Sequence, residues 1–166
     1  MQPVPPEHLP AERKLTGHAA HADALDELIS HAAHVVRIFD RTAGPDFNSA
    51  RRCELLRKLL LASRNNRVYI VLHDASTVAR DCPRLMLVLK QFSHSVFIHQ
   101  TLQAAKRVYD PFSVADEARF VRRFHYARSE GTAAVGDVAA TQLLLKRFQE
   151  IWQASAQAVT ATRLGL

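Results

Sequence analysis

The sequence has few cysteines, few glycines and no long hydrophobic run. Cys53 and Cys82 are the two cysteines among 166 residues, and they lie in apolar-periodic segments without Cys-x-x-Cys or Cys/His spacing. This argues against a disulfide and against a thiolate metal site. No apolar run reaches the roughly 18 residues that cross a bilayer, so we expect no membrane span. The five glycines form no Gly-rich loop after a predicted strand, which removes the usual nucleotide-binding motif.

A nucleophile in a catalytic setting is also absent. Ser93, Ser95 and Ser113 lie in no Gly-x-Ser-x-Gly turn. No sequence feature pairs a nucleophile with the histidines that can act as a base, which are His94, His99 and His125. Without such a pair, lone histidines are usually structural or exposed to solvent.

The ends of the chain differ in composition from its middle. The opening MQPVPPEHLPAERK holds charges and four prolines where a secretory signal would be hydrophobic. We therefore expect residues 1–15 to be a disordered proline-rich leader, 16–158 to form one domain and 159–166 to be a C-terminal tail. A cytoplasmic location is the corresponding expectation.

Helical and strand patterns alternate through the middle of the chain. Apolar spacing and β-branched runs predict helices over 21–34, 49–66 and 76–92, and strands over 35–40, 67–74 and 95–102. Asp81 is expected to cap the third helix, with Pro83 in its first turn. Segments 112–118 and 119–127 are predicted as later strands, followed by a loop over 129–137 and a last helix capped by Asp137. The alternation predicts an α/β domain with a mixed, mostly parallel sheet flanked by helices.

Histidines and strand-end acids are the first candidates for chemistry. His-x-x-His pairs flank the first helix, and residues three apart share a helical face, but roughly 20 Å would separate the two pairs at 1.5 Å per residue. A histidine-rich surface helix without metal is therefore preferred. Asp40 and Asp74 end two strands, where open α/β sheets bind ligands, although the same acids can cap the following segment. The four histidines are His18, His21, His31 and His34.

Basic residues are the second candidate, because the chain carries a formal net charge of +6. Arginine forks suit phosphate groups, and a nucleic-acid interpretation would use Arg57, Arg64, Arg122, Arg123 and Arg128. Alternate residues of a strand face opposite ways, so Phe120, Arg122, Phe124 and Tyr126 would share one face. The aromatic rings are therefore expected in the core and not on a base-stacking surface.

The order of elements, together with VADEARFVRR and FQEIWQAS, resembles one half of the phospholipase D superfamily fold. That family carries His-x-Lys-x-x-x-x-Asp on a strand. With Asp116 at the aspartate, the histidine position falls on Tyr109 and the lysine position on Pro111. Neither residue replaces the nucleophile or the phosphate-binding cation, so the resemblance implies a fold without the family's catalytic residues.

The chain is also similar to small uncharacterised bacterial proteins that keep this half-fold without the catalytic pair. The shared positions are Asp116, Arg123, Phe148, Trp152 and Ser155. The resemblance implies a salt bridge between Asp116 and Arg123, and a homodimer, because enzymes of the superfamily build their cleft from two halves. It implies no cofactor.

Three functional hypotheses follow from these observations. The first is a non-catalytic phospholipase D-like binding or regulatory module with a ligand or protein partner. The second is a basic dimer that binds RNA or DNA. The third is residual phosphodiesterase activity through His99 or His125.

Overall fold

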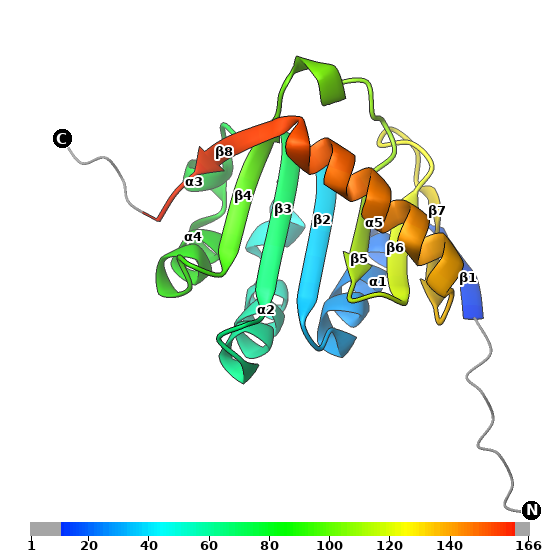
Figure 1. Cartoon of the computed structure of the whole chain (residues 1–166), viewed down its shortest axis with the longest axis horizontal. Coiled ribbons are helices and arrows are strands. Elements are labelled where there is room, and N and C mark those ends of the chain that lie inside the picture. Colours follow the sequence, from blue (N-terminus) through cyan, green and yellow to red (C-terminus); the bar gives the residue numbers. More distant parts are fainter. Residues whose placement is uncertain (1–10, 162–166) are drawn as a thin grey trace, which may run out of the picture.

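The computed structural model describes residues 11–161 as one sheet with helices on both faces (Figure 1). The strands are β1 (Ala11–Thr16), β2 (Val35–Thr42), β3 (Arg67–Asp74), β4 (Val96–Thr101), β5 (Phe112–Ala115), β6 (Arg119–Arg123), β7 (Glu130–Val135) and β8 (Ser155–Val159). The α-helices are α1 (His18–His31), α2 (Ala50–Ala62), α3 (Val78–Asp81), α4 (Pro83–Gln91) and α5 (Val138–Gln153), with 3-10 turns at Pro45–Asn48 and Gln103–Ala105. The predicted α/β domain is confirmed.

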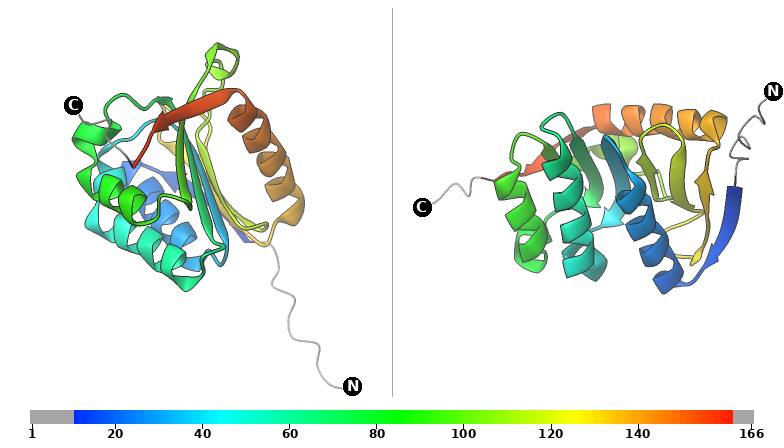
Figure 2. Two further views of the ribbon diagram at one scale, coloured as in Figure 1. Left: turned by 60° about the vertical axis from the view of Figure 1, so that its left-hand side comes forward. Right: turned by 90° about the horizontal axis from the view of Figure 1, so that it is seen from below.

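Helices cover the two faces of the sheet unequally. Figure 2 shows α1, α2 and α4 together on one face, and α5 crossing the other. Two hydrophobic cores correspond to these faces: Ile38, Ile70 and Leu56 belong to the first, and Phe112 and Phe148 to the second. Strands β2 and β3 are buried on both faces because side chains alternate between the two cores.

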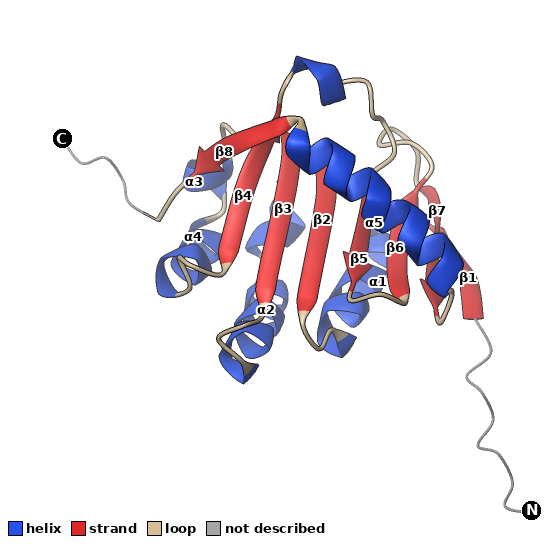
Figure 3. Ribbon diagram, in the orientation of Figure 1, coloured by secondary structure: helices blue, strands red, loops and turns tan. Residues whose placement is uncertain are grey.

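The sheet is mixed, but the expectation of mostly parallel strands is wrong. The strand order is β1-β7-β6-β5-β2-β3-β4-β8 (Figure 3). Only the β2–β3 and β3–β4 pairs are parallel, and the five other pairs of the described chain are antiparallel. The reason is that β5, β6 and β7 are joined by short connections, which permit only antiparallel neighbours. The predicted loop 129–137 contains β7.

Both ends of the predicted domain extend further than expected. Residues 11–15 were expected to be disordered but form β1, which pairs with β7. Strand β8 closes the opposite edge against β4, within and just beyond the expected domain end at residue 158. The remaining parts of the predicted leader and tail, residues 1–10 and 162–166, lie outside the described residues.

Local signals fix the helix ends. Ser49 caps α2 by accepting a 3.1 Å hydrogen bond from the Arg52 N–H. The predicted cap of the last helix is confirmed, since Asp137 accepts from the Ala140 N–H at 3.0 Å. Asp81 is not an N-cap: it ends α3, and α4 starts separately at Pro83. In residues 11–161 no helix is both long and apolar enough to span a bilayer.

Candidate functional site

The β5–β6 hairpin is fixed to the start of β2 by Asp116. This residue has φ 51°, a left-handed conformation that aspartate tolerates better than most residues. Its carboxylate accepts hydrogen bonds from the N–H groups of Ala33, His34 and Val35 at 2.7, 2.8 and 2.9 Å. Burial alone would raise the pKa of Asp116, but these three donors together lower it. Asp116 therefore acts as a structural anchor.

The predicted salt bridge between Asp116 and Arg123 is wrong. Asp116 lies at the turn of the hairpin, whereas Arg123 ends β6 at the other end of the ladder. The Arg123 guanidinium donates to the carbonyl oxygens of Tyr126 at 2.7 Å and Arg128 at 2.8 Å. Arg123 thus holds the loop that follows β6.

A cavity of about 210 Å³ lies beyond the carboxyl end of β2, on the α1 face of the sheet. We call it the β2 cavity. Its wall comes from five helices and strands, α1, β2, α2, β5 and β6, and from the 3-10 turn at Pro45–Asn48. The polar and charged side chains that line it are His18, His21, Asp40, Thr42, Asp46, Arg52, Ser113 and Arg123, and Phe47, Pro111, Phe112 and Val121 are among the apolar ones.

The two degenerate motif positions differ in their relation to this cavity. Pro111 lines it. Tyr109 does not, and its side chain is 49% exposed, with its ring centroid 5.8 Å from that of His125 and 6.2 Å from that of Tyr126. The cavity is therefore next to the motif strand, but neither motif side chain offers it a charge.

The two strand-end acids have different surroundings. Asp40 faces the β2 cavity and accepts one hydrogen bond, from the Arg41 N–H at 2.7 Å. Burial raises the pKa of Asp40, although that bond and the charge of Arg123 oppose the shift. Asp74 is exposed and accepts from the Ser76 N–H at 2.9 Å, and its bonds to Ser76 lower its pKa. Asp74 thus has the turn-stabilising role, and Asp40 is the acid available to a ligand.

The histidines of α1 form no metal site. His18 lies 2.7 Å from the Asp46 carboxylate, and His21 Nε2 lies 2.8 Å from the Ser129 carbonyl oxygen, whereas His31 is at the opposite end of the helix. Within residues 11–161 no three His, Cys, Asp or Glu side chains gather as metal ligands would. The two predicted His-x-x-His pairs therefore stay separate.

His21 is tightly enclosed. Its side chain is largely buried, burial lowers its pKa despite the bond to Ser129, and its Nδ1 has no hydrogen-bond partner within the described chain. Gly131 of β7 lies against it: a Cβ atom at position 131 would be 2.5 Å from His21 Cε1 and 2.0 Å from the Arg122 carbonyl oxygen. Only glycine fits this approach of β7 to β6 and α1.

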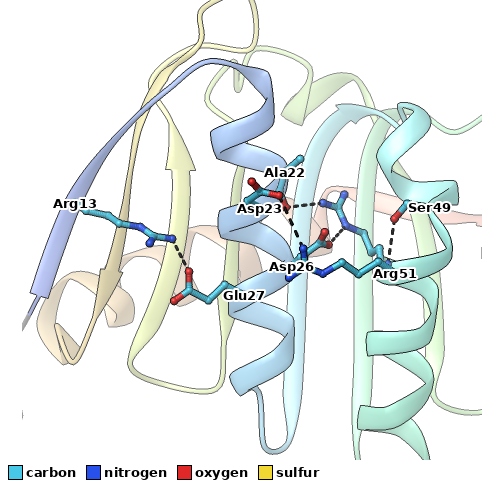
Figure 4. Close-up of polar contacts among 8 residues, drawn as sticks. Arg13, Ala22, Asp23, Asp26, Glu27, Ser49 and Arg51 are labelled. Atoms are coloured by element: carbon cyan, nitrogen blue, oxygen red, sulfur yellow. Dashed lines mark hydrogen bonds and ion pairs between the residues drawn. The ribbon is translucent and has the colours of Figure 1, made fainter.

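A buried ion pair joins α1 to α2 at the cavity wall. Arg52 Nε lies 2.8 Å from Asp26 Oδ1, and a terminal nitrogen donates to the Ala22 carbonyl at 3.2 Å. Arg52 is 2% exposed and Asp26 7%. Figure 4 shows Asp26 and Ala22 on α1 facing the end of α2 that Ser49 caps, with the exposed Arg13–Glu27 pair on the other side of α1, toward β1. The sequence does not reveal this pair, because Asp26 and Arg52 lie on different helices and 26 residues apart.

The five predicted nucleic-acid contacts do not form one surface. Arg122 and Arg123 end β6, and Arg128 lies in the next loop, beyond the carboxyl end of β2. Arg64 precedes β3 and is therefore at the opposite end of the sheet, and Arg57 lies on α2. Arg122 is 3.8 Å from Asp110, so its charge is partly neutralised.

The aromatic side chains of this region are not all in the core. Phe120 is buried as predicted, but β6 ends at Arg123 and the alternation expected for residues 124–126 stops with it. Phe124 is 54% exposed. Tyr126 lies beside His125, with ring centroids 4.5 Å apart. The prediction of a single aromatic core face is therefore wrong beyond residue 123.

His99, a predicted base, has a structural position. Its ring stacks on Trp152 with centroids 3.7 Å apart, and Nδ1 lies 2.9 Å from the Ser155 hydroxyl. Burial lowers the pKa of His99. Phe148 stacks on the same tryptophan at 6.0 Å. The terminal Phe, Trp and Ser positions therefore hold α5 and β8 against β4.

Comparison with solved structures places this architecture among phospholipase D-like folds. Nuc from Salmonella typhimurium, a phospholipase D family member, has a TM-score of 0.61 at 13% identity, covering 91% of this chain and 99% of its own. NucT from Helicobacter pylori has a TM-score of 0.56 at 16% identity, and the match covers 90% of this chain and 99% of NucT. TrmBL2, an archaeal chromatin protein with a novel mode of DNA binding, has a TM-score of 0.64 at 14% identity. The match covers 94% of this chain but only 56% of TrmBL2.

Sequence comparison identifies the family. No curated protein matches the chain significantly. The family described as a domain of unknown function, DUF7931, matches residues 17–164. This match includes α1, the β5–β6 hairpin and α5, and so all the elements around the β2 cavity. The chain therefore belongs to the DUF7931 family, with a phospholipase D-like fold.

Proposed function

We propose that the protein is a non-catalytic phospholipase D-like module that binds a small anionic ligand in the β2 cavity. The observation that carries this proposal is that Arg123 and Asp40 both line the cavity without forming an ion pair with each other. Arg123 makes hydrogen bonds only to carbonyl oxygens, so no carboxylate within the described chain forms an ion pair with it. Its positive charge is available to a ligand.

The other ionisable side chains of the cavity wall, apart from His21, already have side-chain partners. Arg52 pairs with Asp26, and His18 pairs with Asp46. Asp40 does not cancel Arg123 in the same way, because burial raises its pKa and favours its protonated form. A protonated carboxyl group donates a hydrogen bond to an oxygen of an anionic ligand, and the guanidinium N–H groups of Arg123 donate to such an oxygen as well. Together they suit a carboxylate or phosphate group.

The absence of catalysis is part of the proposal. Tyr109 and Pro111 occupy the positions where the superfamily has its nucleophile and phosphate-binding cation, and neither supplies these functions. The alternative is weak phosphodiesterase activity through His99 or His125. His99 is stacked beneath Trp152, which leaves His125 as the histidine to test.

Thermal unfolding with added anions tests ligand binding. Inorganic phosphate, acetate and sulfate, each added at constant ionic strength, are expected to raise the melting temperature of the wild-type protein by mass action. Arg123→Gln should abolish the shift, and Arg128→Gln, a matched exposed arginine, should keep it. A shift that survives in Arg123→Gln would overturn the assignment of the cavity.

A phosphodiesterase assay tests the non-catalytic part. The expected result with bis(p-nitrophenyl) phosphate is no turnover above that of the His125→Ala and His99→Ala variants. Hydrolysis by wild-type protein that either variant abolishes would establish the enzymatic alternative instead.

Nucleic-acid binding is the second candidate function. It is favoured by the partly exposed loop over residues 124–129, which places aromatic rings and Arg128 beyond the carboxyl end of β2. Its general test is a titration against labelled RNA and DNA, because phosphate contacts weaken steeply as salt rises. Binding seen only at low salt would speak against it.

A further inference from the structure

Three aromatic rings gather on the surface beside the β2 cavity. They belong to Tyr109, His125 and Tyr126, and we call them the aromatic platform. His125 and Tyr126 stack with an interplanar angle of 29°, and the ring of Tyr109 lies within 6.2 Å of both. Tyr109 is the most open of the three at 49% exposure. About half of the surface of Tyr109 is thus open to solvent, although its ring also contacts the other two.

The platform is held in place by hydrogen bonds that leave the faces of its rings free. The Tyr126 N–H donates to the Tyr109 carbonyl at 2.9 Å, which joins the two segments. Arg123 fixes the loop through the carbonyls of Tyr126 and Arg128, and the Ala127 N–H donates to His125 Nδ1 at 3.0 Å. The rings are therefore preorganised, which reduces the entropy lost on binding.

Positive charge surrounds the platform. The Arg41 guanidinium lies 4.5 Å from the ring centroid of Tyr126, a cation–π contact. Arg107 lies two residues before Tyr109 and Arg128 two after Tyr126. All three arginines are exposed, and none forms an ion pair with a carboxylate in the described chain. The surface thus combines flat apolar faces with unneutralised cations.

We infer that the aromatic platform binds unpaired bases of single-stranded RNA or DNA, with Tyr109 as the stacking ring and the arginines contacting the backbone phosphates. Aromatic rings stack on bases only when those bases are not already stacked in a duplex, and cations track the phosphates. A protein partner could pack against the rings, but only an acidic protein would also be attracted to the arginines. This inference rests on nucleic-acid binding, the second candidate function.

Fluorescence anisotropy with labelled oligonucleotides tests the inference. The probes are a 12-nucleotide oligothymidylate, a 12-nucleotide oligouridylate and a 12-base-pair duplex, at 50 and 150 mM salt. The single strands are expected to bind more tightly than the duplex. Tyr109→Ala should weaken single-strand binding about tenfold, a loss typical of one stacked base, and Tyr109→Phe should bind within about twofold of wild type.

Matched variants separate stacking from general charge. Arg41→Gln and Arg80→Gln remove the same charge, but Arg80 is on α3 and pairs with Asp81, away from the platform. Arg41→Gln is expected to weaken binding several-fold more than Arg80→Gln. Because Tyr109 uses its backbone for the bond to Tyr126, Tyr109→Ala should fold, which circular dichroism and thermal unfolding check.

Each outcome bears on one claim. Single-strand binding that Tyr109→Ala leaves unchanged would overturn the platform but retain nucleic-acid binding. Absence of any binding at 150 mM salt would overturn both. Equal affinity for duplex and single strand would also overturn stacking. Self-association lost in Tyr109→Ala, without nucleic-acid binding, would instead make the platform an interface between two copies of the chain.

Discussion

Asp116 shows how one residue can determine where a strand begins. Three backbone N–H groups at the α1–β2 junction have no partner in a helix or ladder, and the carboxylate of Asp116 satisfies all three. The sequence identified this residue through the family motif. It could not identify its partners, which lie more than 80 residues earlier in the chain.

Replacing Asp116 by alanine is expected to lower the free energy of unfolding by about 2–4 kcal/mol, because three backbone N–H groups lose a charged acceptor. Urea denaturation at pH 7 measures this. The neighbouring exposed Glu117→Ala is the control, with a change within about 0.5 kcal/mol. Equal effects of the two substitutions would contradict the anchoring role.

The lowered pKa of Asp116 gives the pH dependence of this effect. A carboxylate with a folded-state pKa below its unfolded value stabilises the protein above the unfolded pKa, near 3.9. That stabilisation is lost as the pH falls through the folded-state pKa. The difference between wild type and Asp116→Ala should therefore shrink in strong acid.

Asp40→Asn is expected to stabilise the protein at pH 7–8. Burial raises the pKa of Asp40, so its contribution is favourable at low pH and is lost as the pH rises through the folded-state pKa. Asparagine does not ionise, so the substitution should raise stability at neutral pH by about 1 kcal/mol. Thermal unfolding from pH 4 to 8 measures this, and a variant less stable than wild type at pH 8 would contradict it.

At the scale of elements, the buried Arg52–Asp26 pair joins two helices that cover the same sheet face. Asp26→Ala should cost about 3–5 kcal/mol, because it leaves the Arg52 charge buried without a partner. The double variant Asp26→Leu with Arg52→Met should recover most of this loss. A double-mutant cycle in urea measures the coupling, and additive losses would show that the two charges do not depend on each other.

Element prediction succeeded where local pattern and environment agree. The predicted bounds of strand 67–74 match β3, because residues 68–71 are an unbroken run of β-branched and aromatic side chains at the centre of the sheet. Strand β7 was missed because its GTAAV core has small side chains and a glycine, which are typical of loops. That glycine is required by contacts from β6 and α1, which the local sequence does not contain.

The candidate site was only partly predictable for a related reason. Asp40 was identified by its place at a strand end. The β2 cavity, in contrast, depends on several elements and on which arginines find carboxylate partners. Sequence spacing does not encode those pairings, so Arg123 was assigned to Asp116 and the role of Arg52 was not seen.

At the scale of the whole molecule, we expect a homodimer. The resemblance to the phospholipase D superfamily implies that one half-fold pairs with a second, and the chain carries the same fold over nearly the full length of Nuc and NucT. Sedimentation equilibrium at micromolar concentration measures the mass. A monomer across that range would contradict the family-based geometry.

The close approach at Gly131 limits how this sequence can vary. A side chain at that position would need to enter the space of the Arg122 carbonyl, a backbone atom that cannot rotate away. In a library that allows all twenty amino acids at position 131, selection for folded protein should return glycine almost alone. The packing of β6, β7 and α1 therefore depends on glycine at position 131. Strand β7, whose sequence resembles a loop, tolerates almost no substitution at this position.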